Sequence, residues 1–264
     1  MGTKSKYLHI IVVAAFGLSA APDSSRRNIT ATKNSSVAKS ASGAQADRPG
    51  EGVVSGTVRV AGPPVATARV DMAADPACFK MHSGPVMSEE VVTGANGALK
   101  NVIVYISDGL GNRSFDAPKE AAVFEQKGCA YSPRVLGMQS RQTLQLINND
   151  PTSHNIHALP HNNREWNIFQ PPGSSPTEET FAREEIIPVK CNVHPWMAGY
   201  IGVFKHPYFA ITGKDGTFDL KNVPPGDYTI EAWHEKYGVL TQRVTLETDQ
   251  TKTLEFVFKP QGVR

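Results

Sequence analysis

The sequence predicts an all-β protein. Glycine and proline are frequent, with 22 Gly and 19 Pro among 264 residues, a composition that suits short strands joined by tight turns. Apolar and polar residues alternate in several short runs, as they do along strands with one buried face. The central part of the chain has no convincing helical stripe. These observations together favour a β-sandwich or barrel.

The N-terminus has the pattern of a secretion signal. Lys4 and Lys6 precede an apolar run over residues 8–21, with small residues near its end. The run spans about 14 residues, too short for an ordinary membrane span. We expect residues 1–20 to be a signal peptide and the mature protein to be periplasmic or secreted. The alternative is an uncleaved membrane anchor. Residues 21–51 are rich in small polar residues and predict a flexible linker.

The charge balance argues against a nucleic-acid partner. The formal net charge is +2, and removal of Lys4 and Lys6 would bring it to zero (+2 minus 2). A near-neutral chain without a basic run does not have the charge pattern of a nucleic-acid-binding protein.

We expect a first domain over residues 52–206. Its expected strands cover residues 53–60, 66–72, 99–106, 121–126, 132–136, 142–148, 184–190 and 198–204. The longest irregular stretch runs from Leu159 to Arg183. Connections of that length are usually functional or disordered, and a lid is one interpretation.

A second, smaller domain is expected over residues 207–264. Its strands should cover residues 208–212, 217–220, 228–234, 243–246 and 252–258, with Gly/Pro/Asp turns between them. A unit of this size buries little apolar surface on its own. We therefore expect it to pack firmly on the first domain.

One short segment carries a metal-ligand pattern. Cys191 is followed by His194 and then by Met197, each three residues after the last. Thiolate, imidazole and thioether together form the soft ligand set of a copper ion that changes oxidation state. His154, which follows the expected strand 142–148, is the best-placed second imidazole. His157, further along the same segment, is an alternative ligand, or a residue that contacts the ligands without binding the metal itself.

The other two cysteines are candidates for a disulfide bond. An exported protein meets an oxidising compartment, and three cysteines leave one unpaired. Because Cys191 lies in the metal-ligand pattern, we expect Cys78 to pair with Cys129. Such a bond would contribute roughly 4 kcal/mol in the chain-entropy account. The alternative is that both are buried free thiols.

On these residues the chain resembles the cupredoxins, the proteins with the blue-copper fold. The segment from Cys191 to Met197 is similar to the short ligand loop of amicyanin-type proteins. The resemblance implies a Greek-key β-sandwich that binds one type 1 copper ion through His154, Cys191, His194 and Met197. It further implies that Asn155 hydrogen-bonds towards the cysteine-bearing loop, and that electrons leave through the His194 edge to a redox partner protein.

The C-terminal part resembles a different family. Residues 216–220 (Gly-Thr-Phe-Asp-Leu) and 223–230 (Val-Pro-Pro-Gly-Asp-Tyr-Thr-Ile) are similar to carboxypeptidase-regulatory, transthyretin-like domains. Residues 52–58 also resemble the first strand of such a domain. The resemblance implies a small second β-sandwich and says almost nothing about function.

Several interpretations stay open at this stage. Trp196 either shields the metal from water or packs between the domains. His82 with Met81 and Met87 is a weaker copper-binding candidate. No paired carboxylates or Ser-His-Asp set can be picked out, so we expect no enzymatic activity. Besides electron transfer, the chain is interpretable as an exported structural or binding module, or as a periplasmic copper chaperone or buffer.

Overall fold

The computed structural model describes residues 50–62 and 66–260. The predicted signal peptide at 1–20 and almost all of the predicted linker at 21–51 lie outside these residues. Across the part of the chain that the structure describes, none of the helices has both the length and the apolar character that a membrane crossing requires.

Strands dominate the described residues, and the all-β prediction is confirmed. The strands are β1 (Gly52–Val60), β2 (Ile103–Asp108), β3 (Ala122–Gln126), β4 (Tyr131–Ser132), β5 (Val135–Gln139), β6 (Leu144–Asn148), β7 (His154–Ala158), β8 (Trp166–Gln170), β9 (Thr177–Glu179), β10 (Glu185–Lys190), β11 (Ala198–Phe204), β12 (Phe209–Ile211), β13 (Thr217–Val223), β14 (Gly226–His234), β15 (Gly238–Leu246) and β16 (Thr251–Phe258). Two short helical turns complete the set, α1 (Pro76–Lys80) and η1 (Ala95–Gly97).

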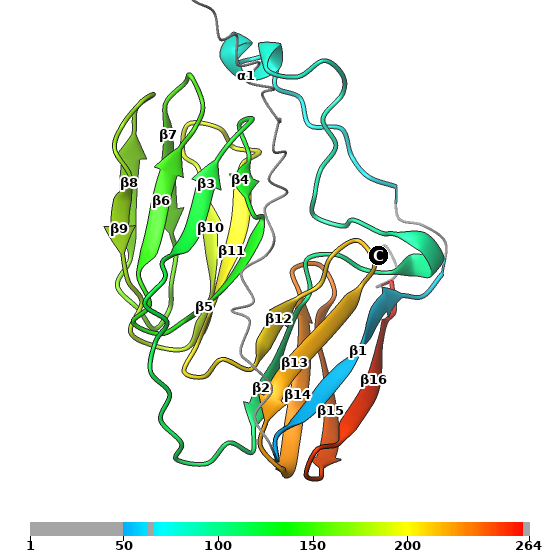
Figure 1. Cartoon of the computed structure of the whole chain (residues 1–264). Helices are drawn as coiled ribbons and strands as arrows, with labels where there is room; N and C mark the ends of the chain where they lie inside the picture. The colour runs from blue at the N-terminus through cyan, green and yellow to red at the C-terminus, as the bar shows by residue number, and fades with distance from the viewer. Residues whose placement is uncertain (1–49, 63–65, 261–264) are drawn as a thin grey trace, which may run out of the picture. The chain divides into compact units, whose positions relative to one another are not determined.

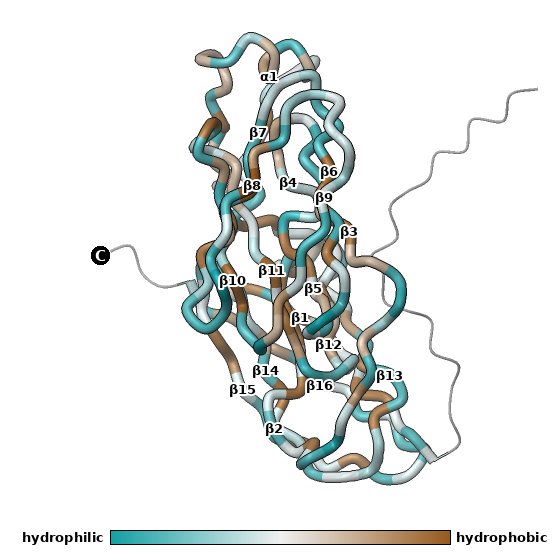
Figure 2. The backbone as a smooth tube through the Cα atoms, turned by 90° about the vertical axis from the view of Figure 1, so that its left-hand side faces the viewer, coloured by the Kyte–Doolittle hydropathy of each residue, from teal (hydrophilic) through white to brown (hydrophobic). Residues whose placement is uncertain are grey.

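The first sandwich contains strands β3 to β11. One sheet has the order β5-β11-β10-β7-β8 and the other the order β4-β3-β6-β9. Side chains alternate between buried and partly buried along strands such as β6, and Figure 2 shows hydrophobic and hydrophilic residues interspersed along the chain. The inward side chains form one core cluster, which includes Phe124, Leu146 and Ile187. This arrangement is consistent with a cupredoxin-like sandwich.

The second sandwich combines residues from both ends of the described chain. Its sheets have the orders β13-β1-β16 and β12-β2-β14-β15. Strand β1 runs antiparallel to β13 and parallel to β16, and β2 lies between β12 and β14. The predicted boundary between residues 206 and 207 therefore needs correcting, because β1 and β2 belong with the C-terminal strands. The first sandwich is inserted between β2 and β12.

Specific contacts join the two sandwiches. Arg134 and Glu235 form a bidentate ion pair with N···O distances of 2.6 and 2.8 Å. The rings of Tyr200 and Trp233 pack edge to face with centroids 4.9 Å apart. A small apolar cluster that includes Phe204 lies around these contacts. The expected firm packing of the smaller domain is thus present as ionic and aromatic contacts.

The connection between β1 and β2 places α1 against the first sandwich. Asp75 caps this short helix by accepting hydrogen bonds from the backbone N–H groups of Ala77 and Cys78. Cys78 forms a disulfide bond with Cys129, which follows β3. Apolar residues on both sides of the helix pack against the core of the first sandwich: Val70, Met72, Met81 and Val86.

The stretch from Leu159 to Arg183 differs from the expectation of an irregular lid. It contains β8, which pairs with β7, and β9, which pairs with β6. Both are therefore edge strands of the first sandwich. The segment that covers the predicted metal ligands is instead the connection that carries α1.

Candidate metal centre

A tight loop between β10 and β11 carries the predicted ligands. The backbone N–H of Cys191 donates to the carbonyl of Met197 at 3.0 Å, and the N–H of Met197 donates to the carbonyl of His194 at 2.9 Å. The N–H of His194 points at the Cys191 sulfur at 3.4 Å. These bonds fold the loop back on itself, so that residues three apart in sequence face the same interior.

Three predicted ligands converge at one buried point. The Nδ1 atoms of His154 and His194 lie 2.8 Å apart. Ligand atoms of His154, Cys191 and His194 all lie within 4.8 Å of one another. The three residues are 0%, 3% and 2% exposed. The cluster therefore offers two imidazoles and one sulfur away from water, which is the donor set of a soft metal site.

A carboxylate lies at the outer nitrogen of each imidazole. Nε2 of His154 is 2.9 Å from Asp150 Oδ2, and Nε2 of His194 is 2.8 Å from Asp75 Oδ2. A carboxylate accepts a proton, so both Nε2 atoms carry hydrogen. The two Nδ1 atoms then face each other at a distance that one shared proton bridges. Removal of that proton leaves two lone pairs directed at the same point, as metal-binding histidines require.

The protonation preferences follow from these contacts. Burial lowers the pKa of His154, but its hydrogen bonds to Asp150 and Cys191 outweigh that effect and raise the pKa to about 9. Burial raises the pKa of the Cys191 thiol, yet hydrogen bonds from His154 and neighbouring amides bring it below its ordinary value. The hydrogen bond from His194 holds the pKa of Asp75 below its usual range. Relative to free side chains, the cluster thus shifts Cys191 towards its thiolate form and His154 towards its protonated form.

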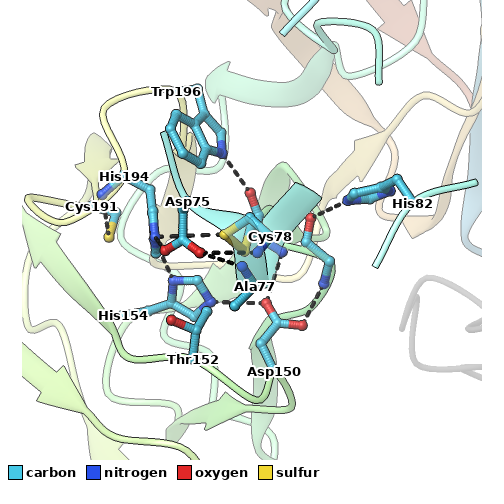
Figure 3. The surroundings of a disulfide bond; sticks show 12 residues. Asp75, Ala77, Cys78, His82, Asp150, Thr152, His154, Cys191, His194 and Trp196 are labelled. Atoms are coloured by element: carbon cyan, nitrogen blue, oxygen red, sulfur yellow. Dashed lines mark hydrogen bonds and ion pairs between the residues drawn. A yellow bond between two sulfur atoms is a disulfide. The ribbon is translucent and has the colours of Figure 1, made fainter. Parts of the chain in front are cut away.

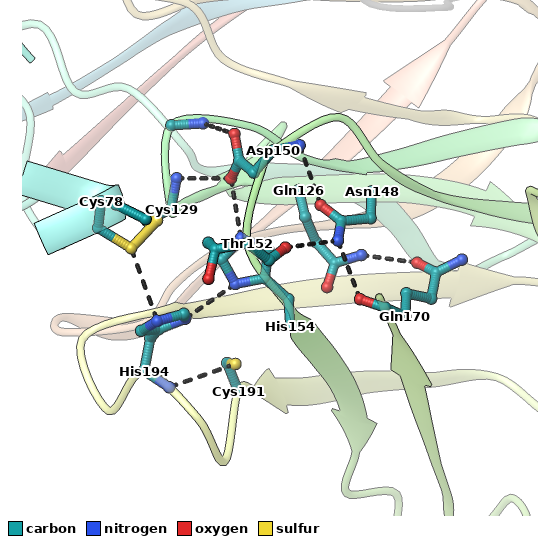
Figure 4. Close-up of polar contacts among 12 residues, drawn as sticks. Cys78, Gln126, Cys129, Asn148, Asp150, Thr152, His154, Gln170, Cys191 and His194 are labelled. Atoms are coloured by element: carbon teal, nitrogen blue, oxygen red, sulfur yellow. Dashed lines mark hydrogen bonds and ion pairs between the residues drawn. A yellow bond between two sulfur atoms is a disulfide. The ribbon is translucent and has the colours of Figure 1, made fainter. Parts of the chain in front are cut away.

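Asp150 is itself fixed by the chain around it. Its carboxylate accepts hydrogen bonds from the N–H groups of Gly128 at 2.6 Å and Cys129 at 2.8 Å. Its own N–H donates to the side chain of Asn148 at 3.0 Å. Figure 4 shows these hydrogen bonds, with Asp150 linked to His154, to the segment that carries Cys129 and to Asn148. Burial raises the pKa of Asp150, but these bonds and the one from His154 reverse the shift and lower it.

Asn155 connects the two predicted ligand segments. Its side-chain oxygen accepts from the backbone N–H of Asn192 at 2.7 Å and lies 3.4 Å from the Cys191 sulfur. Its side-chain nitrogen donates to Asn167 on the next strand. The contact towards the cysteine-bearing loop is the one that the cupredoxin resemblance implied.

The remaining predicted site residues lie close to this cluster or outside it. Met197 is 1% exposed and belongs to the core of the first sandwich. The ring of Trp196 packs over that of His194, with centroids 5.0 Å apart, and its indole N–H donates to the Cys129 carbonyl. Trp196 therefore covers the site on one side, in keeping with the shielding interpretation, while Trp233 is an aromatic between the sandwiches. His157 points to the other face of β7 and pairs with Glu165.

Helix α1 closes the outer edge of His194. Asp75 accepts from its Nε2, and the Cys78 sulfur lies 3.6 Å from the same atom. His82 binds the Gly128 carbonyl at 2.9 Å and holds the helix from its other end. The resemblance implied an exposed His194 edge for electron exit. That implication is wrong for this chain, because the edge is covered by α1.

Sequence reasoning missed the two carboxylates. Asp150 lies four residues before His154, and a histidine close to an acid after a strand was a usable signal. Asp75 is 119 residues from His194 and gave no comparable signal. Its Asp-Pro sequence is typical of a helix start, which indicates the cap but not the histidine that it meets.

Comparisons with known proteins found similarity to parts of this chain. The sequence model of the carboxypeptidase regulatory-like domain matches residues 204–259. No match was found among curated proteins. The solved structures that are similar to this chain include cupredoxins, at low coverage and low similarity.

Three such structures illustrate the extent of the likeness. A copper-containing nitrite reductase from Thermus scotoductus SA-01 is 18% identical over 37% of this chain, with a TM-score of 0.31, and the match spans 25% of that chain. A purple cupredoxin from Nitrosopumilus maritimus is 24% identical over 31% of this chain and 98% of its own, with a TM-score of 0.27. A mutant of amicyanin in its reduced state is 20% identical over 38% and 97%, with a TM-score of 0.29.

Proposed function

We propose that this chain is an exported copper protein that carries single electrons, with no catalytic activity of its own. The observation that carries the proposal is the buried convergence of two imidazole Nδ1 atoms and the Cys191 sulfur. A bound copper ion would supply a one-electron change between Cu(II) and Cu(I). Its protein ligands would be His154, Cys191 and His194, with Met197 as the weak fourth ligand.

The surrounding residues support this assignment through what they do to the ligands. Asp150 and Asp75 hold protons on the Nε2 atoms and thereby direct both Nδ1 atoms inward. Asn155 fixes the loop that presents the Cys191 sulfur. A ligand set held from several sides changes little in geometry when its charge changes, which favours rapid electron transfer.

Partner access follows from which surfaces are left open. Helix α1 and Trp196 cover the His194 ring, whereas Val193 in the same loop is 48% exposed. A redox partner protein would therefore approach the site across the exposed part of the loop, at Asn192, Val193 and Pro195. Export to the periplasm or the exterior, suggested by the N-terminal pattern, suits the disulfide bond.

The test is an absorption spectrum of the full chain loaded with copper. A Cys thiolate bound to Cu(II) gives an intense band at roughly 600 nm, and we expect such a band with one copper per chain. Cys191→Ser should abolish the band. His157→Ala is the matched control, because His157 lies on the same strand as His154 but points away from the cluster, and the band should persist. A colourless Cu(II) form of folded protein would refute the proposal.

A further inference from the structure

A second group of potential ligands lies behind the first. The Cys78 and Cys129 sulfurs and the Nε2 atom of His194 lie within 4.8 Å of one another. Cys78 Sγ is 3.6 Å from that nitrogen, and Asp75 Oδ2 is 2.8 Å from it. Both cysteines are fully buried. His194 therefore separates two clusters, with Nδ1 directed at one and Nε2 at the other, as Figures 3 and 4 show from two sides.

We propose that reduction of the Cys78–Cys129 disulfide creates a second soft-metal site, which binds Cu(I) through the two thiolates and Nε2 of His194. Thiolates are soft ligands that favour Cu(I), as they also favour zinc and iron–sulfur clusters, and an imidazole likewise suits copper. The inference rests on the proposed function only in that His194 would be shared. The disulfide would then keep this second site closed under oxidising conditions.

A dithiol reductant can open the second site by reducing the Cys78–Cys129 disulfide. Two electrons and two protons pass from the dithiol to the disulfide, so that the S–S bond breaks, two thiols form, and the donor becomes a disulfide. Binding of Cu(I) then releases the thiol protons, because the thiolate is the ligand. The Nε2 proton of His194 leaves as well. Asp75 loses its hydrogen-bond donor at that point and becomes available as an oxygen ligand.

The two cysteines should stay close after the bond is broken, because other contacts hold both sides. On the α1 side, Val70, Met72, Met81 and Val86 pack on the core of the first sandwich, and His82 binds the Gly128 carbonyl. On the other side, Asp150 holds the N–H groups of Gly128 and Cys129. The ligands of the second site are thus positioned independently of the covalent bond.

The experiment counts bound Cu(I) with a coloured Cu(I) chelator as competitor. The full chain is titrated without air in two forms, with the disulfide intact and after reduction and removal of the reductant. We expect the reduced form to bind one more Cu(I) per chain than the oxidised form. The variant with Cys78→Ser and Cys129→Ser should keep the oxidised count after the same treatment.

A third sample separates this proposal from the proposed function. Cys191→Ser removes a ligand of the first site only, so its reduced form should still bind one more Cu(I) than its oxidised form. Absence of the visible band of the first site would refute the proposed function and leave this difference unchanged. Equal counts for oxidised and reduced wild type would overturn the second site. Unfolding, or release of α1 to proteolysis within residues 66–98 on reduction, would overturn it equally.

Discussion

The ion pair between Asp150 and His154 makes a quantitative prediction about the metal-free protein. The folded protein raises the pKa of His154 from about 6.5 to about 9. The ion pair therefore stabilises the fold at every pH at which His154 is protonated in the folded state. That stabilisation is fully present below pH ~6.5 and is lost as the pH rises through about 9. Asp150→Asn removes the larger of the two contributions that raise the pKa of His154 and leaves the contribution of Cys191.

The size of the effect follows from the shift. A difference of about 2.5 pKa units, at roughly 1.4 kcal/mol per unit, corresponds to about 3 kcal/mol. Loss of the carboxylate also weakens the hydrogen bonds from Gly128 and Cys129, a cost that does not depend on pH. Asp150→Asn should therefore lower the free energy of unfolding by about 3 kcal/mol more at pH 6 than at pH 10.

Chemical denaturation of the metal-free chain at the two pH values measures this difference. NMR titration of the His154 ring gives the pKa directly and should show it lower in the variant. Asp108→Asn is the matched control, since Asp108 is exposed at the end of β2 and its replacement should change stability little at either pH. An equal loss of stability at pH 6 and pH 10 for Asp150→Asn would refute the reasoning.

Three further predictions concern stability, each measured by denaturant unfolding of the metal-free chain. Replacing Cys78 and Cys129 by Ala opens a loop with a sequence separation of 51 and should cost about 4 kcal/mol. Glu235→Gln leaves the charge of Arg134 unpaired in a contact where the two side chains are 10% and 5% exposed, and should cost about 3–5 kcal/mol. Burial lowers the pKa of His234 to about 4. The unfolded chain therefore takes up a proton first, and as the pH falls from ~6.5 to ~4 stability should drop by about 3 kcal/mol, a loss that His234→Phe removes.

Controls for these three predictions come from the same chain. Glu255 pairs with Arg59 in an exposed contact, so Glu255→Gln should cost less than about 1 kcal/mol. A similarly small loss of unfolding free energy for Glu235→Gln would contradict the prediction that the buried pair is more costly to break than the exposed one. For the disulfide, unchanged unfolding on reduction would contradict the loop account. For His234, the contrary result is a Phe variant that is as sensitive to acid as the wild type.

The ligand loop could be predicted from sequence because its ligand residues are neighbours along the chain. Cys191, His194 and Met197 lie within seven residues, and the alternation of β6 led directly to the His154 segment. The Cys78–Cys129 pairing was reached by elimination once Cys191 had a different role. What local patterns could not supply was the direction of each side chain. His154 and His157 lie three residues apart on one strand and therefore face opposite sides. Which of the two faces inward depends on how β7 packs in its sheet, where it pairs with β10.

The covered site could not be predicted for a topological reason. Val70, Met72 and Val86 are apolar residues in a connection that the sequence assigned to the first domain, yet that connection links two strands of the second sandwich. The connection leaves the second sandwich after β1 and returns to it at β2. Between these strands its apolar residues are buried against the core of the first sandwich. Asp75 meets His194 only as a result of that path. The contact therefore depends on how the two sandwiches are interleaved. That arrangement requires β1 to pair with β16, whose partner residues are 198 positions apart (251 minus 53), and at this separation no local pattern specifies a partner.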